Sequence, residues 1–155
     1  MKIYLAGPLF TTPEREFNAQ LATRLRAAGH EVYAPEENPA SERTGKAIFL
    51  QDLAGLDWAE GVVAMMDGAD PDSGTSWECG YAYATKKPVV LFRSDSRVSG
   101  DADDIPYNMM LIILSSATLL GLDGRGAIRN AGFVHPQRPI TVNLAPARDP
   151  ASDSA

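Results

Sequence analysis

Short apolar runs alternate with helix-like segments along the chain, and this alternation constrains the fold more than any other feature. Four of the runs are rich in apolar and β-branched residues and are bounded by Gly, Pro or charged residues, as buried strands are. Strands that alternate with helices indicate an α/β fold with a parallel sheet. The four expected strands are KIYLAG (2–7), HEVYAP (30–35), GVVAMMDG (61–68) and KPVVLF (87–92).

The first helix is expected between the first two strands. Thr12 is the predicted N-cap, Pro13 suits the first helical position, and acidic residues follow in the first turn. Apolar side chains then recur every three or four positions until Gly29, which is the predicted stop.

Two further helices are expected in the middle of the chain. One covers about 45–58 and is predicted to place Ile48, Leu53 and Leu56 on its inner face. The other follows the loop after the third strand and runs to about Lys86.

The pattern changes toward the C-terminus. PYNMMLIILSSAT (106–118) is predicted to be a helix, and RPITVNL (138–144) is a candidate fifth strand. The final residues, 145–155, are expected to form a disordered tail. A chain of 155 residues is long enough to build one core, so residues 1–144 are expected to form a single domain.

Composition and charge exclude several classes of function. A net charge of −6 without any basic run argues against nucleic acid or an anionic membrane surface as a partner. The single cysteine, Cys79, rules out an internal disulfide and is expected to be a small buried residue. With only His30 and His135 besides, the chain is expected to bind no metal and no other cofactor.

Neither a signal peptide nor a membrane span is expected. The N-terminal apolar run is short and is interrupted by Gly-Pro. The longest apolar stretch, MMLIILSSATLLGL, has 14 residues, which is too few to cross a bilayer. The expected location is the cytoplasm.

An acidic cluster follows the third strand, in GADPDSGTSWECGYA (68–82). Thr75 followed three residues later by Glu78 fits a capping box at a helix start, and Asp70 with Asp72 fits an ordinary turn. No EF-hand, P-loop or GxSxG pattern is present to give the cluster another chemistry. A structural role is therefore one interpretation of these carboxylates.

The position of the cluster favours a second interpretation, a ligand site. In open parallel sheets, ligands bind beyond the carboxyl ends of the strands, near the point where the strand order reverses. The residues that follow the first three strands are therefore expected to meet at one edge of the sheet. These residues are Gly7–Phe10, Glu36–Asn38 and Asp67–Glu78.

Four separated blocks, taken in order, resemble the nucleoside 2-deoxyribosyltransferase family over roughly residues 2–120. The acidic intervals also match, with 20 positions from Asp52 to Asp72 and 6 from Asp72 to Glu78. The resemblance implies a flavodoxin-like three-layer sandwich with a central parallel sheet of about five strands. It also implies a site where 2′-deoxyribonucleosides exchange their base for a free purine or pyrimidine base. The blocks are KIYLAGPLF, QDLAGLD, VVAMMDGADPDSGTSWECGYAYATKKPVVL and YNMM.

The resemblance implies catalytic roles for four residues. Glu78 would be the nucleophile that attacks the anomeric carbon, forming a covalent deoxyribosyl-enzyme that a second base resolves with net retention. Asp72 would protonate the leaving base, and Asp52 would be a second carboxylate near that base. Tyr4 would hold Glu78 through its hydroxyl. The residues alone leave simpler roles open, a core tyrosine for Tyr4 and a solvated helix residue for Asp52.

These roles imply opposite requirements for the carboxyl groups. The nucleophile must be ionised, and a position in the first turns of a helix favours that through the helix dipole. The acid must hold a proton near neutral pH. Two neighbouring carboxylates raise the pKa of one of them, so the proximity of Asp52 and Asp72 would favour the protonated acid.

The same resemblance implies a set of substrate-binding residues. Gly7, Phe10 and Gly74 would contact the substrate, with Phe10 stacked on the base or forming a wall of its pocket. Glu37 and Asn38, in the loop after the second strand, are further candidates for base contacts.

Asn108 and Met110 match a family pair that reaches the 5′ end of the sugar from a neighbouring subunit. The resemblance therefore implies a homo-oligomer with sites shared between subunits. A helix cap for Asn108 and a core position for Met110 are the alternatives that the residues leave open.

Two other functions remain open. N-glycosidases that hydrolyse (deoxy)nucleoside 5′-monophosphates share this fold but carry a phosphate cradle after the first strand. This chain has Pro8, Leu9 and Phe10 there, followed by two threonines and Arg15, so the transferase is the preferred prediction. A non-catalytic nucleotide-binding module is the third possibility, but it would not need carboxylates at the matched intervals.

Overall fold

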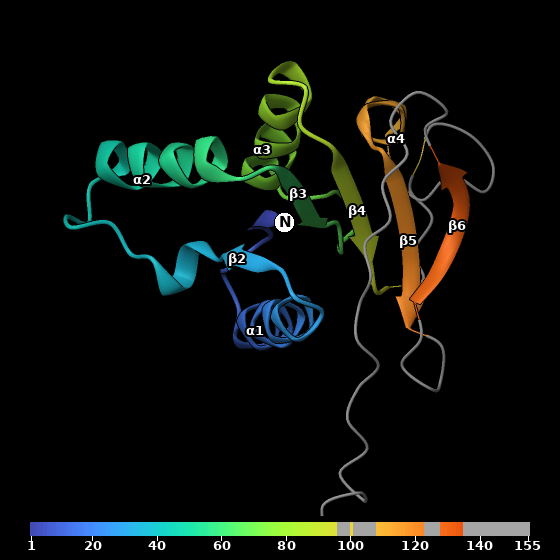
Figure 1. The fold of residues 1–155 in the computed structure, drawn as a ribbon, viewed down its shortest axis with the longest axis horizontal. Coiled ribbons are helices and arrows are strands. Elements are labelled where there is room, and N and C mark those ends of the chain that lie inside the picture. The colour runs from blue at the N-terminus through green and yellow to red at the C-terminus, as the bar shows by residue number, and fades with distance from the viewer. Residues whose placement is uncertain (96–99, 101–107, 123–127, 135–155) are drawn as a thin grey trace, which may run out of the picture.

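A computed structural model of the chain describes residues 1–95, 100, 108–122 and 128–134. Within this part, six strands form one sheet in the order β2-β1-β3-β4-β5-β6 (Figure 1). β1 to β5 are parallel, and β6 pairs antiparallel with β5. The predicted α/β fold with a parallel sheet of about five strands is confirmed. The strands are β1 (Lys2–Ala6), β2 (Glu31–Tyr33), β3 (Gly61–Met65), β4 (Val89–Arg93), β5 (Ala117–Leu122) and β6 (Ile128–Val134).

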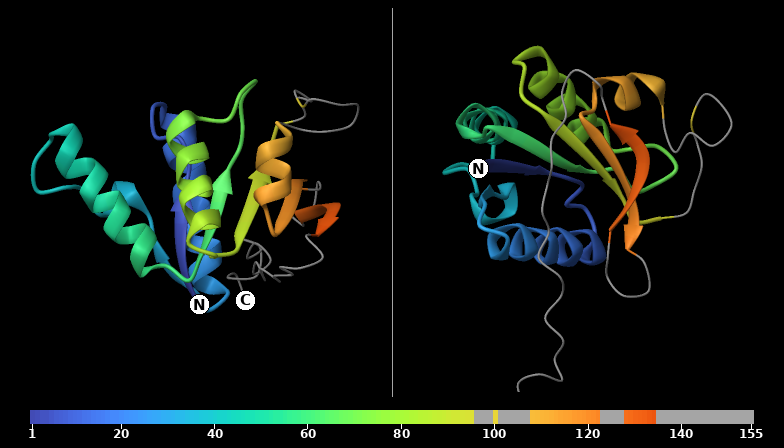
Figure 2. Two further views of the ribbon diagram at one scale, coloured as in Figure 1. Left: turned by 90° about the horizontal axis from the view of Figure 1, so that it is seen from above. Right: turned by 45° about the vertical axis from the view of Figure 1, so that its right-hand side comes forward.

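Helices cover both faces of the sheet (Figure 2). One helix, α1, packs on one face, and α2, α3 and α4 pack on the opposite face. A short 3₁₀ helix, η1, directly follows β2. The bounds are α1 (Thr12–Ala27), η1 (Pro35–Glu37), α2 (Gly45–Trp58), α3 (Ser73–Ala84) and α4 (Met109–Leu114).

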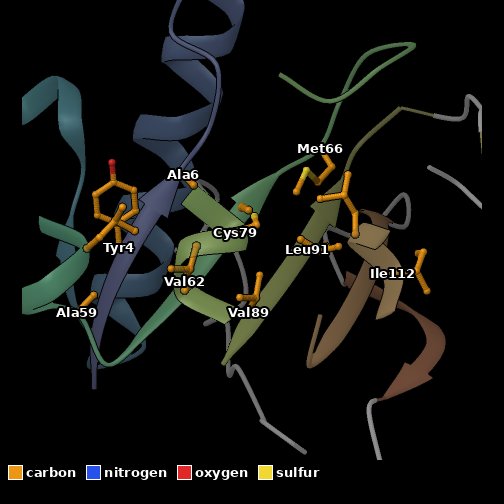
Figure 3. Packing of buried hydrophobic residues seen from close by; sticks show 13 residues of the cluster. Tyr4, Ala6, Ala59, Val62, Met66, Cys79, Val89, Leu91 and Ile112 are labelled. Carbon is orange, nitrogen blue, oxygen red and sulfur yellow. The ribbon is translucent and has the colours of Figure 1, made fainter. Parts of the chain in front are cut away.

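The alternation of side chains along each strand builds a core on both faces. In β1, Tyr4 and Ala6 point toward α2 and α3, whereas Ile3 and Leu5 point toward α1. Cys79 of α3 is buried in the first of these cores, beside the strands that Figure 3 shows. This arrangement places the side chain of Tyr4 on the face that α3 covers.

The strand order reverses at β1, which pairs with β2 on one side and with β3 on the other. The segments 7–10, 36–38 and 67–78 follow the carboxyl ends of these three neighbouring strands. They therefore begin at one edge of the sheet, as expected, and that edge is where α/β sheets bind ligands.

The helix α1 begins one residue earlier than predicted, and a capping box holds its start. The N-cap is Thr11, not Thr12: its hydroxyl accepts a hydrogen bond from the Glu14 backbone N–H, and its own N–H donates to Glu14 Oε2. Gly29 ends the helix with a φ of +88°, a conformation that favours glycine.

The helix α2 has the predicted bounds, but only part of its predicted inner face is buried. Leu56 is fully buried and Leu53 partly so, whereas Ile48 is 49% exposed, contrary to the prediction. Ile48 belongs to the N-terminal half of α2, and Figure 1 shows that this half extends past β2, the edge strand of the sheet.

The region after residue 108 differs most from the expectation. The helix predicted over 106–118 is only Met109–Leu114 among the described residues, and β5 already begins at Ala117. Ser115 and Ser116 make the change of direction, since the Ser115 hydroxyl donates to the Ile112 carbonyl and the Ser116 N–H donates to Val89 O at 2.6 Å. The fifth parallel strand is therefore Ala117–Leu122.

Two predictions for the C-terminus cannot be compared with the structure. The candidate strand 138–144 and the expected tail 145–155 lie outside the described residues. Among the helices that are described, none is long and apolar enough to cross a membrane.

Candidate active site

A tyrosine and a glutamate meet at the candidate site. Tyr4 lies in β1 and is fully buried, and its hydroxyl donates a 2.6 Å hydrogen bond to Glu78 Oε1. Glu78 lies in the second turn of α3, next to the buried Cys79. The hydrogen bond joins two residues that are 74 positions apart in the sequence.

The start of α3 differs from the predicted capping box. The N-cap is Asp72, whose Oδ2 accepts from the Thr75 backbone N–H at 2.8 Å and from the Thr75 hydroxyl at 3.1 Å. The helix therefore begins at Ser73, and the interpretation of Thr75 and Glu78 as a capping box is wrong. Because Asp72 caps the helix, the carboxylate of Glu78 is not used for capping.

Burial and nearby negative charge give Glu78 an unusual acidity. Burial is the largest cause, and with the charges of Asp52 and Asp72 it raises the pKa of Glu78 to about 7, against the lowering effect of the Tyr4 hydrogen bond. The sequence analysis expected the helix dipole to keep Glu78 ionised. That effect fades beyond the first turn, and Glu78 lies in the second.

Asp52 and Tyr4 are perturbed by the same surroundings. Burial raises the pKa of Asp52, which lies on α2. Burial and the charge of Glu78 raise the pKa of Tyr4, with a smaller contribution from Asp52, so the Tyr4 phenol stays protonated and donates. The structure thus brings together Tyr4, Asp52, Asp72 and Glu78, from three elements and the loop before α3.

The predicted substrate-binding residues of the loops lie at the same edge of the sheet. A Cβ on Gly7 would lie 3.0 Å from Asn18 Oδ1 and 3.2 Å from Met65 Cβ, so glycine permits the close approach of these side chains. Phe10 is 77% exposed. Gly74 is exposed in the first turn of α3.

Asn108 and Met110 belong to α4, which packs beside α3. Asn108 is the N-cap of α4, and its Oδ1 accepts from the Met110 backbone N–H at 2.9 Å. Met110 is 77% exposed and so is not a core residue. The hydrogen bonds of the described residues connect neither of them to Tyr4 or Glu78.

Glu37 and Asn38, the candidates for base contacts in the loop after β2, both have hydrogen-bond partners within their own chain. Glu37 forms a two-pronged ion pair with Arg26 of α1, at 3.0 and 2.5 Å. The side-chain amide of Asn38 donates to the Ala34 carbonyl at 2.9 Å. Both side chains hold η1 in place.

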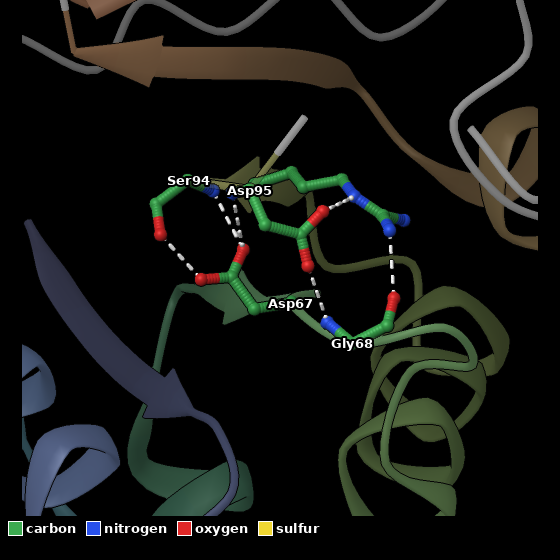
Figure 4. Close-up of polar contacts among 5 residues, drawn as sticks. Asp67, Gly68, Ser94 and Asp95 are labelled. Carbon is green, nitrogen blue, oxygen red and sulfur yellow. Dashed lines mark hydrogen bonds and ion pairs between the residues drawn. The ribbon is translucent and has the colours of Figure 1, made fainter. Parts of the chain in front are cut away.

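A polar network on the other side of β3 was missed by the sequence analysis (Figure 4). Asp67 accepts from the Ser94 N–H at 2.6 Å, from the Ser94 hydroxyl, and from the Asp95 N–H at 3.2 Å. Asp95 accepts from Gly68 N at 2.8 Å and from Arg93 Nε at 2.8 Å, and Arg93 Nη2 donates to Gly68 O at 2.6 Å. We call these five residues the Arg93 network.

The Arg93 network fixes the loop that leads to the candidate site. Arg93 is fully buried, and its guanidinium connects the end of β4 to Gly68, where the loop after β3 begins. Gly68 has a φ of +111°, a conformation that other residues rarely adopt. The same loop ends at Asp72, so the network anchors the segment that starts α3.

A cavity of about 310 Å³ lies beside the Arg93 network. Its lining includes the apolar side chains of Phe17 and Met65 and the carboxylates of Glu14 and Asp67. Phe17 packs in the core on the α1 face, whereas Tyr4 packs on the opposite face. The cavity and the Tyr4–Glu78 pair are therefore on different sides of the sheet.

No group of three or more His, Cys, Asp or Glu side chains within the described part of the chain could hold a metal ion.

Comparison with known proteins relates this site to one family. The sequence model described as nucleoside 2-deoxyribosyltransferase matches residues 3–110. No curated protein matches the chain.

Three solved structures illustrate the range of similarity. A conserved protein from Enterococcus faecalis V583 is 30% identical, with 74% of this chain and 85% of that one covered, at a TM-score of 0.63. A 2-deoxyribosyltransferase from Bacillus psychrosaccharolyticus is 26% identical, with 93% and 100% covered, at a TM-score of 0.68. A CMP N-glycosidase from Clostridium botulinum is 17% identical, with 77% and 88% covered, at a TM-score of 0.55, and shares the fold alone.

Proposed function

The chain belongs to the nucleoside 2-deoxyribosyltransferase family, and from this premise we propose that it exchanges the base of 2′-deoxyribonucleosides. The observation that carries the proposal is the hydrogen bond from the buried Tyr4 hydroxyl to Glu78. It fixes a carboxyl group whose pKa is about 7, so a large fraction is ionised near neutral pH. A carboxylate in this state is a competent nucleophile.

The proposed reaction has two displacements at the anomeric carbon. A Glu78 carboxylate oxygen attacks that carbon, the N-glycosidic bond breaks, and its electron pair leaves with the base, which takes up a proton. A second base then attacks the same carbon from the opposite side and releases the Glu78 carboxylate, while the N–H proton of this base returns to the carboxyl group that protonated the first base. Two inversions leave the configuration of the sugar unchanged.

The proton for the leaving base is proposed to come from the pair of carboxyl groups beside Glu78. Asp72 uses Oδ2 to cap α3, and burial raises the pKa of Asp52. Either carboxyl group can take up a proton and pass it to the leaving base, and Asp72 also fixes the start of α3.

The start of α1 argues against a nucleoside 5′-monophosphate as the substrate. The carboxylate of Glu14 already accepts from the N–H of Thr11, the N-cap of α1, and would repel a phosphate there. Arg15, in the first turn of α1, donates to Leu9 O and to the Thr12 hydroxyl. These contacts favour a nucleoside transferase over an N-glycosidase that hydrolyses nucleoside 5′-monophosphates.

A single incubation tests the proposed function. The protein is mixed with deoxyinosine and adenine, and products are separated by chromatography, with Glu78→Gln as the control. We expect deoxyadenosine and hypoxanthine to form together in the wild type and not in the control. Free hypoxanthine without deoxyadenosine would indicate a hydrolase, and binding without turnover would indicate a nucleotide-binding module.

The sugar preference follows from the same chemistry. A 2′-hydroxyl withdraws electrons from the oxocarbenium-like transition state, so inosine is expected to react far more slowly than deoxyinosine. Comparable rates for the two nucleosides would contradict the proposed substrate class.

The proposed enzyme is a homo-oligomer in which Asn108 completes the site of a neighbouring subunit. The exposed position of Met110, next to Asn108 on α4, is compatible with a contact outside its own chain. Asn108→Ala is expected to lose activity while it remains folded and oligomeric. Size-exclusion chromatography with a parallel activity assay checks this, and a fully active monomer would refute the shared site.

A further inference from the structure

Tyr33, which the proposed mechanism does not use, contacts the candidate site from the neighbouring strand. It lies in β2, directly opposite Tyr4 in the register of the parallel pair. The two rings are stacked, with centroids 5.5 Å apart and an angle of 12° between their planes. The ring that carries the hydroxyl donor to Glu78 therefore rests on the ring of Tyr33.

The other contacts of Tyr33 are with α2, the helix that carries Asp52. Its hydroxyl donates to the Gln51 carbonyl at 3.1 Å and accepts from Gln51 Nε2 at 3.0 Å. One turn later, a Cβ on Gly55 would lie 2.5 Å from the Tyr33 ring. The helix thus packs directly on the ring at Gly55, and the hydroxyl holds the residue that precedes Asp52.

We propose that Tyr33 is a positioning residue that sets the distance between the Asp52 carboxyl group and the Tyr4–Glu78 pair. This role depends on the proposed function in one respect, because it takes Glu78 as the reacting group. Tyr33 contacts both the ring of Tyr4 and the backbone of α2 beside Asp52. It acts through Tyr4 and Asp52, and no direct contact with a substrate is required.

The charges around Glu78 give this position a measurable consequence. The groups that face Glu78 are Tyr4 from β1, Asp52 from α2 and Asp72 from the loop before α3. The charge of Asp52 raises the pKa of Glu78, of Tyr4 and of Tyr33 itself. If Asp52 moves away from the pair, the pKa of Glu78 falls.

The substitution Tyr33→Phe tests the proposal because it keeps the stacked ring and removes only the hydroxyl. The titration of Glu78 is followed by NMR of the ¹³C-labelled carboxyl group, assigned by its absence in Glu78→Gln. We expect the pKa of Glu78 to fall by about half a unit. The turnover number with deoxyinosine and adenine is expected to fall about tenfold, with a smaller change in KM.

A matched control tests whether the loss of any tyrosine hydroxyl that bonds to α2 has the same effect as Tyr33→Phe. Tyr81 of α3 also bonds α2 through its hydroxyl, to Asp57 Oδ1 at 2.6 Å, but near the C-terminal end of that helix. Tyr81→Phe is expected to leave the titration of Glu78 and the turnover number unchanged.

A double substitution tests whether Tyr33 acts through Asp52. In an Asp52→Asn background, Tyr33→Phe is expected to cause no further change in the pKa of Glu78, because the charge that it would displace is gone. Gly55→Ala gives an independent check, since the added methyl group pushes α2 away from the Tyr33 ring. It is expected to lower the pKa of Glu78 as Tyr33→Phe does.

Two outcomes would overturn the positioning role. One is a Tyr33→Phe protein in which Glu78 titrates as in the wild type, and the other is a shift that persists in the Asp52→Asn background. If base exchange is absent from the wild type but Glu78 still responds to Tyr33→Phe through Asp52, the proposed function fails and the positioning role stands.

Discussion

Two groups of carboxylates lie at the same edge of the sheet, and they differ in how fully they are satisfied. In the Arg93 network, Asp67 accepts three hydrogen bonds, and Asp95 accepts one from an N–H group and one from a buried guanidinium. Among the residues that the structure describes, Tyr4 is the hydrogen-bond donor to Glu78, which also faces the charges of two other carboxyl groups. We call the side of the Arg93 network the saturated side, because its carboxylates accept several hydrogen bonds. The side of Glu78 is the unsaturated side.

The difference separates a structural use of carboxylates from a reactive one. Donors that surround an ionised carboxylate stabilise its charge, so Asp67 and Asp95 are suited to hold a loop. Burial and neighbouring negative charge raise the pKa of a carboxyl group, which is the state of Glu78. A substitution of Glu78 should therefore lower mainly the turnover number. A substitution in the Arg93 network should lower mainly the free energy of unfolding.

The largest expected effect is on turnover at the unsaturated side. Glu78→Gln keeps the shape of the side chain but removes the attacking carboxylate, so base exchange should fall by at least about a thousandfold. The melting temperature at pH 7 should not fall. Both quantities are measured on the same preparation, by the deoxyinosine–adenine assay and by thermal unfolding.

Cys79→Ala is the local control for this change. Cys79 is buried beside Glu78 but points into the core, so its substitution should leave turnover nearly unchanged. A trapped deoxyribosyl adduct on Glu78, detected by mass spectrometry of the wild type, would support the covalent step. An active, folded Glu78→Gln protein would return this region to a purely structural role.

The second effect is a dependence of stability on pH. The pKa of Glu78 is about 7 in the folded chain and 4.5 for an unperturbed group, so the folded state binds the proton more tightly. This contribution is complete below pH 4.5 and is lost as the pH rises through 7, which amounts to about 3 kcal/mol. Glu78→Gln has no titrating group at this position, so its stability does not depend on pH in this way. At pH 8 it should be more stable than the wild type.

Urea unfolding of both proteins between pH 4 and pH 8 measures this difference. Other groups, such as Asp52, titrate in both proteins and cancel to first order in the comparison. Stability curves that run parallel over this range would show that Glu78 is not destabilised by its surroundings.

The third effect belongs to the saturated side. Asp95→Asn removes the negative charge that pairs with the fully buried Arg93 guanidinium, and the free energy of unfolding should fall by about 2 kcal/mol. Turnover per folded molecule should fall by less than about tenfold, since α3 keeps its own core contacts. Urea unfolding and the exchange assay together give the two values.

Arg26→Gln provides the comparison for an ion pair at the surface. The side chains of Arg26 and Glu37 are 39% and 42% exposed, so the loss of this pair should change stability by less than about 1 kcal/mol. An Asp95→Asn protein that is no less stable than Arg26→Gln would remove the distinction between the two sides of the edge.

The sequence predicted the fold and the segments of the site better than it predicted the contacts within them. Strands and helices over the first ninety residues follow from apolar periodicity, caps and stops, which are local properties. The helix predicted over 106–118 was too long at its C-terminal end, because pairing with β4 makes Ala117–Leu122 a strand and no local pattern reveals that pairing. Ile48 was misplaced because the sequence does not show where the sheet ends beneath α2.

The contacts that define the site depend on register and burial. The resemblance led to Glu78, but the capping-box interpretation failed because Asp72, three residues before Thr75, is the stronger cap. The role of Tyr33 requires knowledge that β2 pairs with β1 at Tyr4. The raised pKa of Glu78 follows from burial against β1, which residue types and spacings do not report.

The smallest expected effect concerns Tyr4, whose hydroxyl donates to Glu78 on the unsaturated side. Tyr4→Phe keeps the stacked ring but removes the hydrogen bond that lowers the pKa of Glu78, so this pKa should rise above 7. A hydrogen bond to a charged group corresponds to about one pKa unit, so the rise of kcat/KM with pH should move upward by about that much. Above pH 9, where Glu78 is ionised in both proteins, the two rates should converge to within a few-fold. A profile with an unchanged midpoint would mean that Tyr4 does not tune Glu78, and the contrast between the two sides would then rest on burial and on the neighbouring carboxylates alone.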